Sequence, residues 1–231
     1  MLEMGCMVRK TSIPFEIPHS PDLSFEQSFW QNGQNKVAGL DEAGRGAWAG
    51  PVVAAVVILP VMDNINHQLS GVRDSKQMNA NQRGYWGEKI KEFAVDWGIG
   101  MATHDEIDQI GILSATRVAM KRSIASLTST PDHLLIDAVI LSDIKIPQSS
   151  LIKGDQRSLS IAAASVLAKT TRDSLMIEQD SCFPQYGFKN HKGYGTRLHQ
   201  TALSEHGPCP IHRMTFKPLL EKSALFTLES Q

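Results

Sequence analysis

The sequence lacks the features that mark disulfide-stapled, membrane-spanning and exported proteins. Its three cysteines, Cys6, Cys182 and Cys209, are too few and too scattered among 231 residues for a disulfide framework. The longest apolar run, residues 52–59, is far shorter than the roughly 20 residues that cross a bilayer. The first residues show no charged start followed by an apolar core, so they do not predict a signal peptide. We therefore expect a cytoplasmic protein without membrane contact.

A strong net charge is also absent, since 23 Lys and Arg balance 24 Asp and Glu to give a net charge of -1. A hydrophobic content of 42% and a charged content of 20% are typical of a globular chain with one well-cored domain. The charge is unevenly spread, because residues 183–220 hold five Lys or Arg, one acid and four of the eight histidines. Such a basic region suits a polyanionic partner, although a solvated tail would have the same composition.

The most informative stretch is Asp41-Glu42-Ala43-Gly44-Arg45-Gly46, in which two adjacent carboxylates lead into a glycine-rich turn. A glycine turn often cradles a phosphate, but two negative charges would repel one. Carboxylates and a phosphate can share a site when a divalent cation bridges them, because hard cations take oxygen ligands. The stretch therefore indicates phosphodiester chemistry, although an exposed acidic pair beside an ordinary turn is equally compatible with it.

A dinucleotide-binding loop is a poor interpretation of the same glycines. That motif requires a strand, a turn and then a helix. Here the turn is followed by residues 52–59, whose β-branched content and length favour a strand. Strand, turn and strand make a hairpin.

The rest of the chain alternates between apolar runs and helical periodicity, which predicts a mixed α/β domain. Besides the hairpin (37–41 and 52–59), we expect strands at 97–102 and 133–140 and another opening at Ile152, with helices at 79–93, 105–127, 158–177 and 196–206. Residues 1–35, broken by three prolines, are expected to form an extension draped on the domain or partly disordered.

Two further carboxylates lie where a strand or its end is expected. Asp137 interrupts the apolar run 134–140, and a buried charge is costly without a partner or a metal. Asp155 follows a short apolar segment and is by itself typical of a turn or helix cap. With Asp41 and Glu42 they could all end strands of one sheet, where four close carboxylates would repel one another without cations.

The run from Ala38 to Gly46 resembles the opening signature of the type 2 ribonuclease H family, whose bacterial members are ribonuclease HII. Further runs resemble that family's motifs in the same order, from about residue 36 to 218: Asp74-Ser75-Lys76, Leu135-Ile136-Asp137, Lys153-Gly154-Asp155, residues 161–169 with Thr171-Arg172-Asp173, Tyr186-Gly187-Phe188, His191-Lys192-Gly193-Tyr194 and His212-Arg213. Each run alone is weak, whereas the ordered series is highly specific.

The resemblance implies a ribonuclease H-like mixed sheet flanked by helices, with a small helical C-terminal lobe. The expected divisions are an N-terminal extension (1–35), a catalytic domain (36–180) and a basic substrate-binding lobe and tail (181–231). A monomer is the expected state.

The activity implied by this resemblance is a metal-dependent endonuclease of DNA replication and repair. It would hydrolyse the RNA strand of RNA–DNA hybrids and nick 5′ of single ribonucleotides in duplex DNA, leaving 5′-phosphate and 3′-hydroxyl ends. By resemblance, Asp41, Glu42, Asp137 and Asp155 hold two Mn²⁺ or Mg²⁺ ions, one activating water and the other stabilising the leaving 3′-oxygen. Neighbours on a regular strand point to opposite faces, so Asp41 and Glu42 are expected to share a site only if the strand distorts.

The resemblance also implies how the substrate is recognised. Telling RNA from DNA at one nucleotide requires contact with a 2′-hydroxyl, and Gly44, Arg45 and Gly46 are expected to approach that sugar. Tyr194 is expected to pack on the deoxyribose that follows the ribonucleotide. Candidate phosphate contacts are Lys76, Lys169, Lys192 and Arg213. Asp173 is expected to assist the carboxylates or to pair with Arg172 or another neighbouring basic side chain.

Two alternatives stay open beside the nuclease. A hybrid-binding protein without catalysis would keep the turn and Tyr194 but lose a carboxylate, and all four are present. A junction resolvase of the same fold would cut all-DNA substrates. Two positions depart from the family pattern: Ala47-Trp48, where Pro-Leu is frequent, and Ala138, where glycine is usual.

Overall fold

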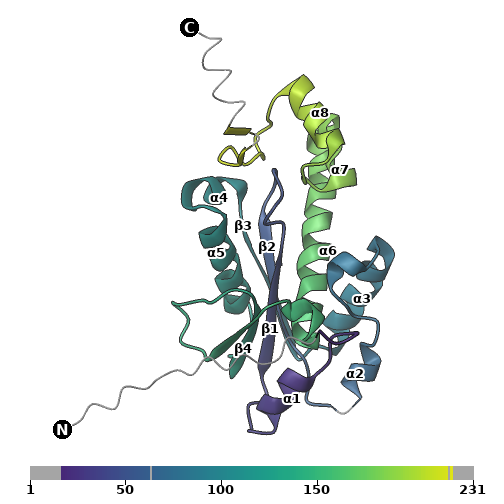
Figure 1. The fold of residues 1–231 in the computed structure, drawn as a ribbon, viewed down its shortest axis with the longest axis vertical. Helices are drawn as coiled ribbons and strands as arrows, with labels where there is room; N and C mark the ends of the chain where they lie inside the picture. Colours follow the sequence, from purple (N-terminus) through teal and green to yellow (C-terminus); the bar gives the residue numbers. More distant parts are fainter. Residues whose placement is uncertain (1–16, 63, 218, 221–231) are drawn as a thin grey trace, which may run out of the picture.

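The computed structural model describes residues 17–62, 64–217 and 219–220, in which a mixed five-stranded sheet lies between helices (Figure 1). The strands β1 (Val37–Ala43), β2 (Val52–Ile58), β3 (Asp96–Ala102), β4 (His133–Asp137) and β5 (Gln148–Leu151) lie in the order β3-β2-β1-β4-β5. The first three are antiparallel, and β4 and β5 run parallel to β1. The predicted α/β fold with a mixed sheet is confirmed.

Helices cover both faces of the sheet. They are α1 (Ser24–Trp30), α2 (Ile65–Gln68), η1 (Ser75–Gln77), α3 (Ala80–Phe93), α4 (His104–Ile110), α5 (Ile112–Ala125), η2 (Gly154–Gln156), α6 (Leu159–Cys182), η3 (Pro184–Tyr186), α7 (Phe188–His191) and α8 (Arg197–His206). In Figure 1, α5 lies on one face of the sheet and the long α6 on the other, with α3 outside α6. In the described ranges no helix is long and apolar enough to cross a membrane.

The central strands are buried on both sides, as their apolar sequences predict. All seven residues of β2 are buried, because alternate side chains point to opposite faces and each face has its own helices. Leu40 and Val56 belong to the core on the α5 side, whereas Ala43 and Val57 belong to the core on the α6 side. This alternation determines the face from which each site residue projects.

Gly39 allows α6 to approach β1 closely. A Cβ atom at this position would lie 2.2 Å from the carbonyl carbon of Ser160, so any other residue would push the start of α6 off the sheet. The start of α6 is also anchored by α1, because Glu26 accepts hydrogen bonds from the hydroxyls of Ser158 and Ser160 at 2.6 Å. The described part of the N-terminal extension thus packs on the domain, while residues 1–16 lie outside the described residues.

Three predicted boundaries were wrong. The helix predicted at 105–127 is two helices, because Gly111 between α4 and α5 has a φ of 77°. The strand predicted at 133–140 ends at Asp137, because Ala138 adopts a φ of 51°. The next strand, β5, ends at Leu151 instead of opening at Ile152.

A separate apolar cluster holds the C-terminal lobe together. It contains Met176 of α6, Tyr186, Phe188 and Leu203, with Trp48 of the β1–β2 connection packed against it. The lobe is therefore attached to the end of α6 and to the turn that follows the two adjacent carboxylates, as Figure 1 shows at the top of the molecule.

Candidate active site

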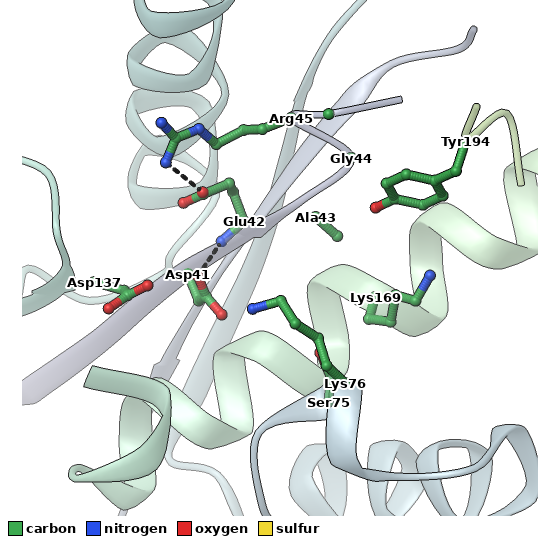
Figure 2. Close-up of a pocket in the computed structure, with 11 residues that line it drawn as sticks. Asp41, Glu42, Ala43, Gly44, Arg45, Ser75, Lys76, Asp137, Lys169 and Tyr194 are labelled. Atoms are coloured by element: carbon green, nitrogen blue, oxygen red, sulfur yellow. Dashed lines mark hydrogen bonds and ion pairs between the residues drawn. The ribbon is translucent and has the colours of Figure 1, made fainter. Parts of the chain in front are cut away.

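A pocket of about 380 Å³ opens where β1 ends, beside α6 (Figure 2). Its lining combines carboxylates, the glycine turn, lysines and one tyrosine: Asp41, Glu42, Ala43, Gly44, Arg45, Gly46, Ser75, Lys76, Asp137, Lys169 and Tyr194. Nine of the twelve predicted site residues are therefore in the pocket lining.

Asp41 and Glu42 share this pocket without the predicted strand distortion, and that prediction was wrong. The register between β1 and β2 runs unbroken from Ala38 to Ala43. Pairing of β1 with its other neighbour, β4, runs only from Val37 to Leu40. Glu42 lies beyond the last residue of β1 that pairs with β4, so β4 does not cover this edge of the strand. Its side chain, which is longer than that of Asp41, can therefore reach the pocket from the opposite face of β1. The Asp41 carboxylate accepts a hydrogen bond from the N–H of the next residue, Glu42, at 2.7 Å.

Asp137 reaches the same region from the end of β4, and Asp155 reaches it from η2, just before α6. Leu40 pairs with Ile136, so Asp137 is the next residue beside Asp41 at the carboxyl end of β4. The Asp137 carboxylate accepts the N–H of Gly154 at 2.7 Å, which fixes the loop that presents Asp155. Asp155 itself is buried and lies 3.4 Å from the Lys76 ammonium.

Burial and mutual repulsion raise the pKa values of these four carboxyl groups. The pKa of Asp41 is well above its ordinary value because the group is desolvated and faces Glu42, Asp137 and Asp155. Burial also raises the pKa of Glu42, although Arg45 opposes the shift. The pKa of Asp137 is raised by burial, and that of Asp155 rises to about 6 through burial and the nearby Asp74 and Asp137. Positive charge in the pocket would therefore be strongly favoured.

The donor set fits hard divalent cations. Oxygen ligands from carboxylates are those that Mg²⁺ and Mn²⁺ prefer. The Glu42 Oε2 atom is buried without a hydrogen-bond partner among the described residues, and an orphaned anionic oxygen is what a cation would satisfy. Across the described ranges, no three His, Cys, Asp or Glu side chains already converge as a metal cluster. Instead, Arg45 pairs with Glu42 at 3.1 Å, and Lys76 pairs with Asp155.

The glycine turn presents its backbone to the pocket. Gly44 has a φ of 98°, a conformation that favours glycine. A Cβ atom on Gly46 would meet no atom within 4 Å, so this position borders open space. The Arg45 side chain turns back to Glu42 (Figure 2), which leaves the backbone of the turn accessible to a ligand.

Tyr194 lies across the pocket from the carboxylates, next to α6 (Figure 2). The ammonium of Lys169 lies 5.3 Å from the centre of its ring, and the guanidinium carbon of Arg172 lies 5.2 Å from it. Lys169 also pairs with Asp173 at 2.7 Å, and Asp173 lies 3.3 Å from Arg83. Asp173 therefore forms ion pairs with neighbouring basic side chains, which is one of the roles expected for it.

Two predicted phosphate contacts are not part of the pocket lining. Arg213 has no exposed surface, and it donates to the carbonyls of Gly50 at 2.9 Å and Arg45 at 3.0 Å. It therefore supports the glycine turn from behind and is not placed where a phosphate could reach it. Lys192, which has a φ of 54°, donates from its ammonium to the carbonyl of Lys189.

Sequence reasoning gave no role to three residues that the structure brings to the site. Asp74 is buried and accepts from Gln156 at 3.2 Å, next to Asp155. Ser75 lines the pocket, and its hydroxyl receives a hydrogen bond from Ser165 at 2.8 Å. Arg172 lies buried between the glycine turn and Tyr194. The motif containing Asp74 and Ser75 was the available signal for the first two.

Comparisons with known proteins show which family the chain resembles along most of its length. A family model described as Ribonuclease HII matches residues 38–219. A ribonuclease HII of Chloroflexus aurantiacus is 51% identical over 210 residues, covering 90% of this chain and 98% of the relative. One of Enterococcus faecalis is 52% identical over 195 residues, covering 84% of this chain and 74% of the relative.

Solved structures show the same fold. The crystal structure of ribonuclease H2 from Pyrococcus horikoshii has a TM-score of 0.68 and 25% identity, covering 83% of this chain and 99% of the other. The structure of Bst-RNase HIII in complex with Mn²⁺ has a TM-score of 0.63, 19% identity and coverages of 86% and 71%.

Proposed function

This chain belongs to the ribonuclease HII family, and we propose that it cleaves single ribonucleotides embedded in duplex DNA on their 5′ side as well as RNA in continuous hybrids. The family makes the enzyme a metal-dependent ribonuclease that cleaves RNA in RNA–DNA hybrids. Support for the finer specificity comes chiefly from one feature: three of the four carboxylates, Asp41, Glu42 and Asp137, line the same pocket as the glycine turn and Tyr194.

We assign Asp41, Glu42, Asp137 and Asp155 as the residues that would hold two divalent ions, Mg²⁺ or Mn²⁺. When bound, such ions activate a water and stabilise the leaving 3′-oxygen of the scissile phosphate. The chain's own contribution is to hold four oxygen donors at the end of one sheet. Arg45 orients the Glu42 carboxylate through their 3.1 Å ion pair. Gly154 similarly orients Asp137.

Recognition of the sugar is assigned to the turn and to Tyr194. Gly44 and Gly46 have no side chains to shield the backbone, so its polar groups can approach a 2′-hydroxyl, the group that distinguishes RNA from DNA. Tyr194 would pack on the deoxyribose that follows the ribonucleotide. Lys76, whose side chain is 76% exposed, and Lys169 would contact phosphates at the rim of the pocket.

The test is cleavage of a DNA duplex that contains one ribonucleotide, with Mg²⁺ or Mn²⁺, by the wild-type enzyme and by Asp41→Asn. We expect one nick on the 5′ side of the ribonucleotide, leaving a 3′-hydroxyl and a 5′-phosphate. Asp41→Asn should remove this activity, because it takes a charged oxygen from the middle of the carboxylate group. Asp143→Asn is the matched control, since Asp143 is exposed and pairs with Lys121 at 3.2 Å, outside the pocket lining.

Other outcomes would favour the alternatives. Tight binding of the duplex with no cut in either metal would indicate a hybrid-binding module. Cleavage of an all-DNA duplex or of a four-way junction at a similar rate would indicate a resolvase and would contradict sugar recognition by residues 44–46.

A further inference from the structure

The two segments proposed to read the substrate, residues 44–46 and Tyr194, are about 150 residues apart in the sequence, and a third residue joins them. Arg172 of α6 has no exposed surface, and it is absent from the described pocket lining. It lies directly behind both segments, where it cannot touch a substrate held in the pocket.

The Arg172 guanidinium binds three backbone carbonyls from two parts of the chain. Its Nε donates to Pro51 at 2.8 Å and its Nη2 donates to Ala49 at 3.0 Å, both in the β1–β2 connection. Its Nη1 donates to Lys192 at 2.9 Å, two residues before Tyr194. A planar fork can satisfy three acceptors in fixed directions, which the point charge of a lysine cannot do.

Arg172 also packs against the reading residues themselves. A Cβ atom on Gly44 would lie 2.0 Å from its Nε, so the turn rests directly on the guanidinium. The guanidinium carbon lies 5.2 Å from the centre of the Tyr194 ring. The two segments are further joined where the N–H of Trp48 donates to the carbonyl of Gly193 at 2.8 Å.

The chemistry of this contact indicates a positional role. A buried arginine is costly to desolvate, and an apolar side chain of similar volume often stabilises a fold as well or better. The guanidinium does what an apolar side chain cannot, because it fixes the directions of three carbonyls and therefore the separation of two loops. That separation determines whether two contacts can fall on adjacent nucleotides.

We infer, on the basis of the proposed function, that Arg172 is a positioning residue for substrate specificity. It holds the turn of residues 44–46 and the Tyr194 ring at the spacing of a ribonucleotide and the deoxyribonucleotide that follows it. An embedded ribonucleotide requires both contacts at once. Inside a continuous hybrid the next sugar is another ribose, so cleavage there depends less on this spacing.

The experiment compares kcat/KM for a single-ribonucleotide duplex with kcat/KM for a continuous RNA–DNA hybrid. Arg172→Lys should lower the first by about 100-fold, as a displacement of about 1 Å at a reacting site can, and lower the second much less. Arg122→Lys is the matched control, because Arg122 of α5 also donates to a backbone carbonyl, that of Met101 at 2.7 Å, but outside the pocket lining. Its ratio of the two kcat/KM values should equal that of the wild type.

Tyr194→Ala and the double variant separate this inference from the proposed function. If Tyr194→Ala leaves the ratio unchanged, the proposed role of Tyr194 fails. If Tyr194→Ala lowers the ratio and Arg172→Lys does not, the inference about Arg172 fails. If Arg172 acts through Tyr194, the double variant should have the same kcat/KM on the single-ribonucleotide duplex as Tyr194→Ala. A loss of kcat/KM equal to the product of the two single losses would overturn the inference.

Thermal unfolding shows whether each variant is folded at the assay temperature. Should Arg172→Lys unfold there, Arg172→Gln replaces it, because it keeps two donors and leaves no buried charge. An equal loss on both substrates by that variant would show a purely structural role and would overturn the inference.

Discussion

Ala138 shows how one strained residue can shape the site. It directly follows Asp137 and has a φ of 51°, in the left-handed region that side chains disfavour. Its N–H donates to the carbonyl of Leu151 at 3.0 Å, which ties the end of β4 to the end of β5. The chain therefore turns sharply just after Asp137, in a conformation that a glycine would adopt without strain.

Ala138→Gly should raise the free energy of unfolding by about 0.5 to 1 kcal/mol. The left-handed conformation costs an L-residue roughly 1–2 kcal/mol, and the greater backbone entropy of an unfolded glycine removes only part of that gain. Urea unfolding of the two proteins measures the difference. Ala125→Gly, at the exposed end of α5, is the control and should destabilise, so a loss at both positions would contradict the strain argument.

At the scale of elements, a chain of neutral histidines connects α8 to the Tyr194 loop. The N–H of Cys209 donates to His212 Nδ1 at 2.9 Å, which leaves the His212 proton on Nε2. That proton can be donated to His199 Nε2 at 2.9 Å, and His199 Nδ1 in turn donates to the carbonyl of Tyr194 at 3.1 Å. Burial lowers the pKa of both imidazoles to about 4, so the chain is neutral near pH 7.

The C-terminal lobe should therefore lose stability in mild acid. Unfolded histidines have a pKa near 6.5, whereas the folded values are about 4. Between these values the unfolded state binds more protons, so stability falls as the pH drops from about 6.5 to 4, by at most about 3 kcal/mol per imidazole. Hydrogen exchange of α8 amides across this range measures the loss. His199→Gln should flatten the dependence, and His67→Gln, an exposed residue of α2, should leave it unchanged.

Elements were easier to predict than the contacts between them. The apolar run 52–59 and the helical periodicity near 79–93 gave β2 and α3 almost to the residue, because hydrophobic spacing follows burial. Gly111 was missed because a single glycine in a helical pattern is usually tolerated at a cost of about 1 kcal/mol. Its positive φ, which the sequence does not reveal, interrupts the helix between α4 and α5.

At the scale of the whole molecule, folding gathers carboxylates from distant segments in a chain of net charge -1. Motif order predicted which residues lie at the pocket: Asp41 directly follows the last β1 residue that pairs with β4, and Asp137 is the last residue of β4. It could not predict the two buried arginines, Arg172 and Arg213, because a long side chain that reaches carbonyls more than 100 residues away leaves no periodic trace. Arg213 was expected from the sequence to contact phosphate, whereas in the structure it has no exposed surface and donates to backbone carbonyls.

The concentration of like charge leads to a prediction about metal binding and stability. Because Mn²⁺ or Mg²⁺ would relieve the repulsion only in the folded state, each should raise the unfolding midpoint. At a metal concentration 100 times the Kd the gain is about 2.7 kcal/mol, or about 5–10 °C for a chain of this size. In a thermal melt, adding a chelator should return the unfolding midpoint to its value without metal.

Asp137→Asn provides the decisive comparison for that melt. Without metal it should melt at a higher temperature than the wild type, because one of the repelling charges is gone. With metal it should gain much less than the wild type, because a charged oxygen donor is missing. Asp143→Asn, outside the pocket lining, should show the full shift. If Asp137→Asn also keeps the full shift, the metal binds elsewhere on the molecule, and the assignment of these carboxylates as its ligands is wrong.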